Sequence, residues 1–460
     1  MDFAALRGSP MQHVYRYIDD HSQEAIDRLM RLCRQPSVSA QQIGLHEMAR
    51  LLEDEMRAVG IPARQLPTKT GVPMVYGEIR VEGARRTLLF YNHYDVQPVE
   101  PLDEWVTPPF EPTIRDGRVY ARGATDNKGN IVSRLTAIKA LLDQRGGPPV
   151  NVKFIVEGQE EISSPGLPAF LEEHRDLLEA DGCVWEDTMG RIDAPVVSLG
   201  SKGMCYVELS CKVASVDSHS AYAGIYPNAI WRLVWALSAI KGPDERVRIP
   251  GFYDDVRPLD AAESQIVDQL PPIDGEGLKR VRGLRRLVGD LEDAQIHRRQ
   301  TLEPTCNISG IVSGYHGKGT KTVIPAEAIA RMDFRLVPDQ DPEKIVALLR
   351  AHLSREGFDD VDVVLLGESH PSRSPVDTPL NRAIATASQS VYGKPPIFEP
   401  HQAGSTPQWV VGRYLGMPCS ATGVGYVTCM SHAPNENVRI DHLIDGAKYM
   451  AAIMDAFADA

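Results

Sequence analysis

The alternation of short apolar runs with amphipathic stretches in the first 185 residues restricts the fold most strongly. Residues 87–91 and 152–157 are short and mostly apolar, as buried strands are, and residues 128–143 between them repeat apolar side chains at helical spacing. Buried strands that alternate with amphipathic helices are typical of βαβ units. The sequence therefore predicts an α/β domain in which a mixed, mostly parallel sheet lies between helices.

The pattern changes after residue 196, where apolar and polar residues begin to alternate one by one, as they do in half-exposed antiparallel strands. The elements expected here are strands at 204–216, 326–336 and 361–366, helices at 228–240 and 342–356, and a charged helical insertion at 243–305. The α/β signals return after residue 372 and end in a helix at 442–456. We therefore expect a discontinuous domain, residues 1–196 and 375–460, and an inserted α+β domain, residues 197–374, with an open antiparallel sheet.

The charge balance and the lengths of the apolar runs exclude several classes of protein. The chain has 49 Lys and Arg against 62 Asp and Glu, a net charge of -13, which argues against nucleic acid as a partner because phosphate binding needs clustered positive charge. No apolar run reaches the roughly 18–20 residues of a membrane helix, and the first 20 residues lack a secretory signal pattern. The seven cysteines are scattered without a CxxC pair. We therefore expect reduced thiols and a cytoplasmic protein that binds neither nucleic acid nor membrane.

Residue types that bind metals follow the predicted strands. His93 and Asp95 come directly after the run at 87–91, and Asp126 stands just before the predicted helix at 128–143. Ligands gather beyond the carboxyl ends of strands in open α/β sheets, where a His can bind a metal and a nearby Asp can orient its ring. Each feature also has an ordinary structural interpretation, namely a hydrogen-bonded His at a strand end and an Asp that caps a helix.

Three further segments end in acid or histidine. Glu160 and Glu161 follow a predicted strand, and two adjacent carboxylates repel each other unless a cation lies nearby. Because neighbouring residues point in different directions, one carboxylate can bind a metal while the other takes a proton from water. Glu186 and Asp187 follow another strand-like run, and His432 lies in a loop rich in Gly and Ser. The glutamate pair alone could be an exposed acidic turn, but the combined nitrogen and oxygen ligands suit zinc, manganese or cobalt better than calcium or magnesium.

In their order and spacing these segments resemble the motifs of the dinuclear-metal exopeptidases. That family includes cytosolic non-specific dipeptidases, carnosinases, aminoacylases, acetylornithine deacetylases and succinyl-diaminopimelate desuccinylases. The resemblance covers residues 21–456, and the matching motifs are HYD at 93–95, GATDNKG at 123–129, GQEE at 158–161, WEDT at 185–188 and SHxPNE at 431–436. It implies a two-metal hydrolase closest to the dipeptidase branch, with a catalytic metal-binding domain and an inserted lid or dimerisation domain.

The resemblance also implies a role for each residue at the strand ends. Glu160 would be the general base, and Asp95 would orient His93. Asp126 would bridge two divalent ions, zinc or else manganese or cobalt, and Asp187 would be the alternative to Glu186 as a ligand. The complete ligand set implied for the two ions is His93, Asp126, Glu161, Glu186 and His432.

In the inserted domain the resemblance points to residues that bind the substrate. His219 would reach across a homodimer into the active site of the partner subunit and stabilise the oxyanion; Ala221 follows it closely, where dipeptidase relatives often have glycine. A substrate carboxylate would be bound by Arg335 and by the loop that carries Gly404 and Ser405, and His316 would contact the substrate.

The activity implied is hydrolysis of the peptide bond in dipeptides or similar small amides that bear a free carboxylate. The alternative with the same mechanism is an N-acyl-amino-acid amidohydrolase, or a carboxypeptidase that accepts longer acyl groups. A non-catalytic metal-binding interaction protein is disfavoured because every ligand and base position is filled. A serine hydrolase is disfavoured because no GxSxG stands at a strand–helix turn.

Overall fold

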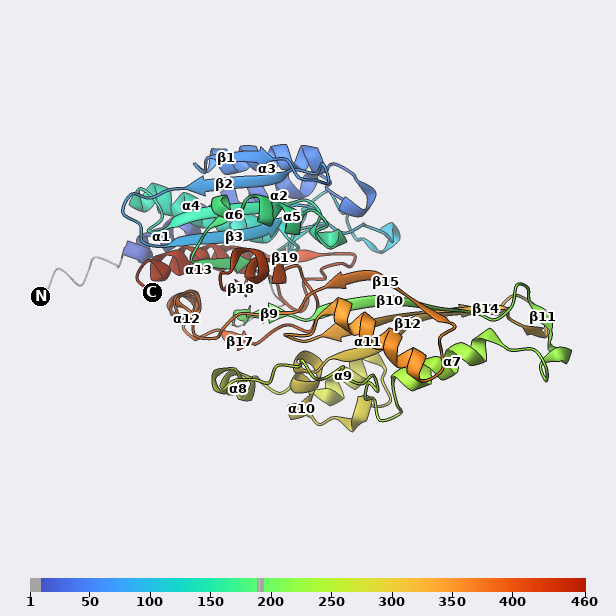
Figure 1. Ribbon diagram of the computed structural model, residues 1–460. Helices are drawn as coiled ribbons and strands as arrows, with labels where there is room; N and C mark the ends of the chain where they lie inside the picture. The colour runs from blue at the N-terminus through green and yellow to red at the C-terminus, as the bar shows by residue number, and fades with distance from the viewer. Residues whose placement is uncertain (1–9, 188–189, 191–193) are drawn as a thin grey trace, which may run out of the picture. The chain divides into compact units, whose positions relative to one another are not determined.

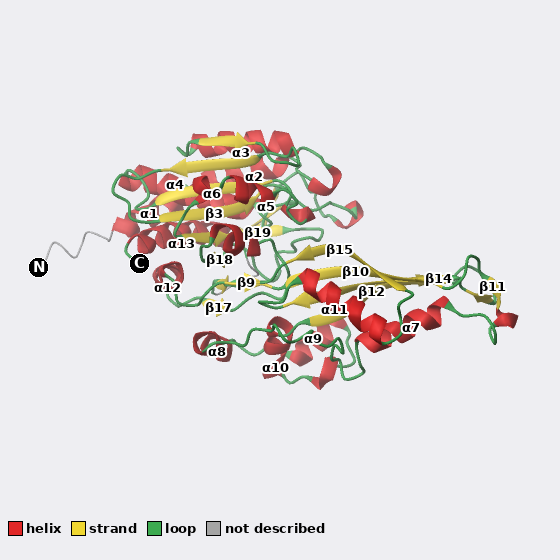
Figure 2. Cartoon of the chain, viewed as in Figure 1, coloured by secondary structure: helices red, strands yellow, loops and turns green. Residues whose placement is uncertain are grey.

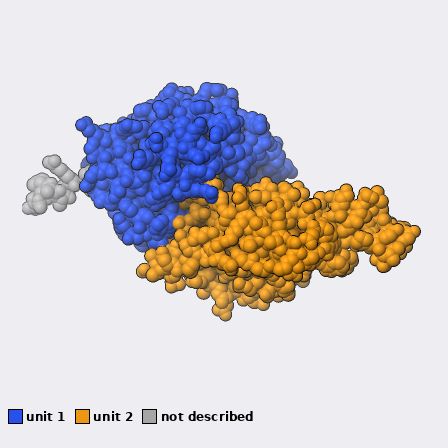
Figure 3. Space-filling model, viewed as in Figure 1, with its two compact units in different colours: residues 1–200, 374–400, 410–460 blue, residues 201–373, 401–409 orange. Residues whose placement is uncertain are grey.

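The structure is a computed structural model of the chain, and it describes residues 10–187, 190 and 194–460 (Figure 1). Thr188, the last residue of the WEDT motif, lies outside the described residues. The chain divides into two compact units, coloured separately in Figure 3. The first unit contains Met1–Gly200, Ser374–Pro400 and Val410–Ala460, and the second contains Ser201–Arg373 and His401–Trp409.

The first unit is built on one mixed sheet. Its strands, in sheet order, are β1 (Ala63–Leu66), β2 (Met74–Ile79), β6 (Asn151–Glu157), β3 (Thr87–His93), β7 (Gly182–Trp185), β18 (Cys419–Ala421), β8 (Val196–Ser198) and β17 (Ile397–Glu399). The pairs β6–β3, β3–β7, β7–β18 and β8–β17 are parallel, and the others are antiparallel. This confirms the expected α/β class with a mixed, mostly parallel sheet. It also places the carboxyl ends of β6, β3 and β7 at the same edge of the sheet.

Helices and a small sheet surround these strands (Figure 2). The helices are α1 (Pro10–Asp20), α2 (Ser22–Arg34), α3 (Leu45–Ala58), α4 (Lys128–Arg145), α5 (Leu167–Glu173), α6 (Arg175–Leu178), α12 (Pro379–Tyr392) and α13 (Ile440–Ala458). The small sheet consists of β19 (Asn437–Arg439), β5 (Arg118–Tyr120) and β4 (Thr113–Arg115). Of the 18 residues of α4, 13 are buried. The polar residues of α4 must therefore find their hydrogen-bond partners inside the protein.

The second unit is built on an antiparallel sheet with the order β12 (Thr305–Ser313), β14 (Glu327–Leu336), β10 (Gly203–Lys212) and β15 (Val361–Ser369). Every second residue of β10 is buried, as the one-by-one alternation predicted. The helices α7 (Ala229–Ile240) and α11 (Pro342–Arg355) pack against the sheet and against each other (Figure 1). This confirms the expected inserted α+β arrangement with an open antiparallel sheet.

The expectation of three strands in this sheet was wrong, because β12 adds a fourth. This strand lies at an edge of the sheet, pairs only with β14 and is exposed along most of its length. The alternation that reveals a half-buried strand is therefore missing from its sequence. The remaining elements of this unit are the short pair β11 (Ser218–His219) and β13 (Val323–Ile324), the expected helical insertion with α8 (Ala261–Asp268), α9 (Gly275–Arg282) and α10 (Asp293–His297), and the strand β16 (Ser372–Arg373). The chain enters the unit through β9 (Gly200–Ser201).

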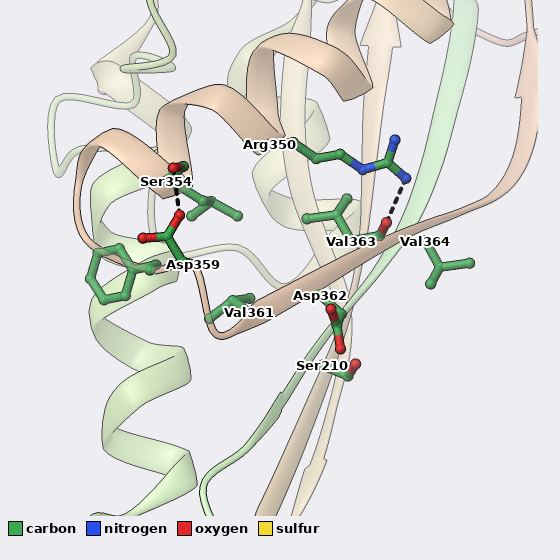
Figure 4. A pocket seen from close by; sticks show the side chains of 10 residues that line it. Ser210, Arg350, Ser354, Asp359, Val361, Asp362, Val363 and Val364 are labelled. Atoms are coloured by element: carbon green, nitrogen blue, oxygen red, sulfur yellow. Dashed lines mark hydrogen bonds between the residues drawn. The ribbon is translucent and has the colours of Figure 1, made fainter.

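The opposite edge of the same sheet borders a cavity of about 430 Å³ between α11 and β15. Figure 4 shows Arg350 at its border, where the guanidinium donates to the carbonyl oxygen of Val363 at 2.7 Å. This bond ties α11 to the edge strand β15. Among the described helices, none is both long enough and apolar enough to cross a membrane.

Candidate metal centre

The residues singled out in the first unit lie at the common edge of three neighbouring strands. His93 is the last residue of β3, and Glu186 follows β7 directly. After β6, the chain turns into a short 3-10 helix, Glu160–Ile162, that begins with the glutamate pair. Parallel pairing of β3 with β6 and β7 therefore brings these side chains together beyond the strand ends.

Asp126 lies between two histidines and turns one carboxylate oxygen toward each. His93 Nε2 is 3.1 Å from Asp126 Oδ1, and His432 Nε2 is 2.9 Å from Asp126 Oδ2. On the first side, His93 Nε2 is also 3.3 Å from Glu186 Oε2. On the second side, His432 Nε2 is 3.3 Å from Glu161 Oε2. The cluster therefore offers two groups of nitrogen and oxygen ligands that share Asp126.

The electrostatics of this cluster fit a site for cations. Burial, followed by the nearby charge of Glu186, raises the pKa of Glu160 well above its usual value. Burial also raises the pKa of Glu186 to about 8, and the neighbouring Asp126 adds to this shift. Glu186 Oε2 is buried and accepts no hydrogen bond from the described residues. Divalent cations would neutralise this excess of negative charge and coordinate the orphaned oxygen, so the donor set fits metal ions.

His432 is the more exposed of the two histidines. Hydrogen bonds to Asp126 and then to Glu161 raise the pKa of the His432 imidazole to about 11. Its backbone, like those of Met430 and Asn435, has a positive φ, of 60° for His432. Non-glycine residues rarely adopt this left-handed conformation and are found in it mostly where the surrounding structure imposes it. The loop is therefore shaped in a way that presents this ring to Asp126.

Asp95 holds both the histidine and the glutamate pair. Its Oδ1 atom lies 3.3 Å from His93 Nδ1 and accepts the backbone N–H of Glu160 at 3.1 Å. Its Oδ2 atom accepts the backbone N–H of Glu161 at 3.1 Å. Because Nδ1 of His93 is directed toward Asp95, the other ring nitrogen, Nε2, faces Asp126 and Glu186. Asp95 can therefore fix the orientation of the ring, as carboxylates beside metal-binding histidines do.

The sequence left Glu186 and Asp187 as alternatives, and the geometry favours Glu186. Asp187 Oδ2 accepts from the side-chain amide of Asn130 at 2.8 Å, and its Oδ1 accepts the backbone N–H of Gly425 at 3.3 Å. Both oxygens of Asp187 are therefore engaged with these structural partners, whereas Glu186 approaches His93.

Sequence reasoning missed Arg134, a buried guanidinium on α4. Its Nη1 atom donates to the carbonyl oxygen of Tyr91 at 2.5 Å, and its Nη2 atom donates to those of Trp185 at 2.7 Å and Glu186 at 3.1 Å. Arg134 therefore ties the end of β3 to the end of β7 and fixes the separation of His93 and Glu186. The only sequence signal was an arginine within the predicted amphipathic helix.

Sequence reasoning also assigned no role to Glu436, the last residue of the SHxPNE motif. Its fully buried carboxylate accepts from the Arg122 guanidinium at 2.9 Å and from the backbone N–H groups of Gly123 at 2.9 Å, Thr125 at 3.0 Å and Asp126 at 2.9 Å. Because Glu436 belongs to the same loop as His432, it connects that loop to the segment that carries Asp126.

The residues assigned to the substrate lie in the second unit. Arg335 Nη1 donates to Ser405 Oγ at 2.7 Å, and the carbonyl oxygen of Gly404 accepts the backbone N–H of Lys202 at 3.0 Å. His219 and His316 are exposed and form local hydrogen bonds, to Ala221 and Ser313 respectively. The structure therefore brings Arg335 together with the loop of Gly404 and Ser405.

Comparison with known proteins identifies similar chains. The family model Peptidase family M20/M25/M40 matches residues 89–456. The chain is 27% identical to Beta-Ala-His dipeptidase of Mus musculus over 98% of this chain and 96% of that protein. It is 28% identical to the Cys-Gly metallodipeptidase of Schizosaccharomyces pombe over 97% and 98%, respectively.

Solved structures agree with the sequence comparisons. The M20 family metallo-carboxypeptidase of Sulfolobus solfataricus is 38% identical, with a TM-score of 0.88 over 95% of this chain and 100% of that one. Human carnosine dipeptidase 1 is 26% identical, with a TM-score of 0.81 over 98% and 100%. Each similarity extends over nearly the whole chain and therefore includes both units.

We expect Glu436→Gln to weaken metal binding, because a neutral amide holds the backbone N–H of Asp126 less strongly than a carboxylate does. The loss should be about 10-fold or more, as is usual for groups that orient metal ligands. Calorimetric titration of the metal-free protein with Zn²⁺ measures it. The matched control is Glu263→Gln, which changes a buried, ion-paired carboxylate of the second unit. Equal Zn²⁺ affinities for Glu436→Gln and the wild type would contradict the assigned role.

Proposed function

The chain belongs to peptidase family M20/M25/M40, and we propose from this membership and from its site that it is a dinuclear metallodipeptidase. The observation that carries the proposal is Asp126, whose two oxygens face two histidines beside an adjacent pair of glutamates. Relatives named as dipeptidases align with nearly the whole chain, which supports dipeptides as the substrate class. We assign catalysis to the first unit and the role of a lid and dimerisation domain to the second.

The family implies divalent metal ions, and we propose two per chain, zinc or else manganese or cobalt. His93, Asp126 and Glu186 would hold one ion, and Asp126, Glu161 and His432 would hold the other. When bound, such ions lower the pKa of water and polarise a carbonyl group.

Glu160 is the residue proposed to move the proton. It accepts a proton from the attacking water and delivers it to the leaving amine. Its position supports this role, because its backbone N–H is fixed by Asp95 and its neighbour Glu161 faces His432. The pair therefore divides the two tasks, with one carboxylate free for proton transfer and the next one available to a cation.

We propose that Arg335, Ser405 and Gly404 bind the C-terminal carboxylate of the substrate. A guanidinium can donate two parallel hydrogen bonds to a carboxylate, and the bond from Arg335 to Ser405 holds the guanidinium beside the loop at 2.7 Å. His316 is proposed as an additional substrate contact from the same unit. A free carboxylate on the substrate is thus the expected requirement of this site.

A carboxypeptidase or N-acyl-amino-acid hydrolase is the second candidate. The observation that favours it is the 38% identity to a structure described as a metallo-carboxypeptidase. Both candidates use the same metal site and carboxylate site, and they differ in the group accepted on the amino side of the scissile bond. Rates for dipeptides, N-acetyl amino acids and longer N-acyl amino acids, measured on one metal-loaded preparation, separate the two.

We propose a homodimer formed through the second unit. Trp231 and Trp235 of α7 are 58% and 55% exposed, and Val312 of the edge strand β12 is 74% exposed. Large exposed apolar side chains and unpaired strand edges are both features that a partner usually covers. A second copy of the chain is the proposed partner, and His219 would act in its active site.

All seven cysteines are free and buried, which supports the proposed cytoplasmic location.

The general-base assignment is tested by Glu160→Gln. Removing the base should lower kcat by about 10²–10⁴-fold, while the protein still binds two metal ions, since Glu160 is not assigned as a ligand. Dipeptide hydrolysis and metal analysis of the same sample measure both quantities. Glu172→Gln, at an exposed position on α5, is the control. Near-normal activity of Glu160→Gln with both metals bound would rule out this role.

The proposed action of His219 across the dimer is tested by mixing two inactive variants. His219→Ala keeps Glu160, and Glu160→Gln keeps His219, so only their heterodimer contains one complete active site. Statistical exchange of subunits should restore about a quarter of the wild-type activity, since half of the dimers are then mixed and each has one active site. Co-expression with two affinity tags isolates the heterodimer. A heterodimer as inactive as its parents would show that His219 does not act across the interface.

A further inference from the structure

Lys202 lies between β9 and β10 and is fixed to the loop that carries Gly404 and Ser405. Its backbone N–H is shared between the carbonyl oxygens of Gly404 at 3.0 Å and Gln402 at 3.2 Å. The preceding residue, Ser201, forms an isolated parallel bridge with Gln402. The main chain at Lys202 and the loop proposed to bind the substrate carboxylate therefore form one local structure within the second unit.

The side chain of Lys202 is buried without a carboxylate partner. The residue is 1% exposed, and its Nζ atom donates to the backbone carbonyl oxygen of Glu303 at 2.5 Å. The carboxylate of Glu303 forms its ion pair with Arg299 instead. An ammonium has three N–H donors. Only one of those of Lys202 has an acceptor among the described residues. Burying a charge without an opposite charge is costly, so an anionic ligand beside this ammonium would be stabilised.

Arg335 is the second cation at this position. The antiparallel register pairs Gly203 with Leu336 and Met204 with Arg335, so the first residues of β10 adjoin the end of β14. Burial and then the Arg335 charge lower the pKa of Lys202 to about 8. The two cations therefore lie close enough for their like charges to repel each other.

The charged groups around Lys202 leave one positive charge unbalanced. The cations are Lys202, Arg299, Arg335 and Arg373. The carboxylates are those of Glu303, paired with Arg299, of Glu263, paired with Arg373, and of Asp333, 4.0 Å from Arg335. Burial, followed by the charges of Arg373 and Lys202, lowers the pKa of His401 to about 3, so this imidazole is neutral and adds no charge. A single carboxylate is the ligand that would balance this group.

We propose that Lys202 is a specificity-determining residue, the second cation of the carboxylate site that Arg335 and Ser405 form. Arg335 makes the direct contact, and the ammonium of Lys202 adds the positive charge that makes the site select peptides with a free C-terminal carboxylate over C-terminal amides. This inference rests on the proposed function, since it requires that the carboxylate of the substrate bind at Arg335.

The test compares a dipeptide with its amide on the metal-loaded enzyme. Lys202→Met keeps the apolar stem and removes the charge. We expect KM for alanyl-alanine to rise about 10-fold or more, as loss of an interaction with a charged group does, while kcat stays within about 2-fold and kcat/KM for alanyl-alaninamide stays near the wild-type value. Lys202→Arg should restore a low KM for the dipeptide.

The matched control is Lys241→Met. Lys241 also donates through Nζ to a backbone carbonyl of the second unit, that of Cys306 at 3.2 Å, but it has its own carboxylate partner in Glu245. This control should leave both substrates unaffected. If Lys202 had only a structural role, Lys202→Met would lower activity equally on the dipeptide and the amide, or would leave KM unchanged. Either result overturns the proposal.

Two further measurements keep failure of the inference separate from failure of the proposed function. If the wild type cleaves no dipeptide but cleaves N-acetyl-alanine, the dipeptidase proposal fails, and the comparison of Lys202→Met is made with N-acetyl-alanine and its amide. If thermal unfolding shows that Lys202→Met is poorly folded, Lys202→Gln replaces it. Calorimetry then measures the binding of L-alanine to Lys202→Gln and to the wild type. An L-alanine affinity equal to that of the wild type overturns the proposal.

Discussion

The shared carboxylate of Asp126 is the interaction on which the rest of the site depends. Each of its oxygens faces one histidine, and each histidine also approaches one glutamate. Burial by itself would raise the pKa of Asp126, but hydrogen bonds from His432 and His93 outweigh burial and lower it. The site thus concentrates negative charge at the edge of a sheet, and the family membership supplies the reason, since this charge would hold divalent cations.

The surrounding structure keeps these side chains in place without belonging to the proposed ligand set. Arg134 ties the ends of β3 and β7 together, Asp95 orients His93 and the glutamate pair, and Glu436 links the loop of His432 to Asp126. A ligand set drawn from five separate segments needs such supports, because displacement of one segment changes the distances to all the others. Arg134, Asp95 and Glu436 therefore position the side chains of the candidate metal site.

The sequence was sufficient for what depends on local pattern and on motif order. Buried strands that alternate with amphipathic helices predicted the α/β sheet. Histidine and acid at the strand ends drew attention to His93 and Glu160, and the motif order added the family. It was insufficient for partners that the fold brings together from afar. No local pattern reveals the partners of Arg134 or of Glu436, although Glu436 belongs to a quoted motif. The fourth strand β12 was missed because an exposed edge strand lacks alternation. The buried Lys202 also became apparent only once the pairing of β10 with β14 and the loop beside it were known.

The central claim is that two metal ions share Asp126, and a crystal structure of the metal-loaded protein tests it most directly. Anomalous difference maps recorded at the zinc absorption edge locate each ion independently of any assumed ligand. We expect two peaks in the first unit, one beside His93 and Glu186 and the other beside Glu161 and His432, with Asp126 between them. A single peak at full zinc saturation, or two peaks that do not share Asp126, would contradict this account.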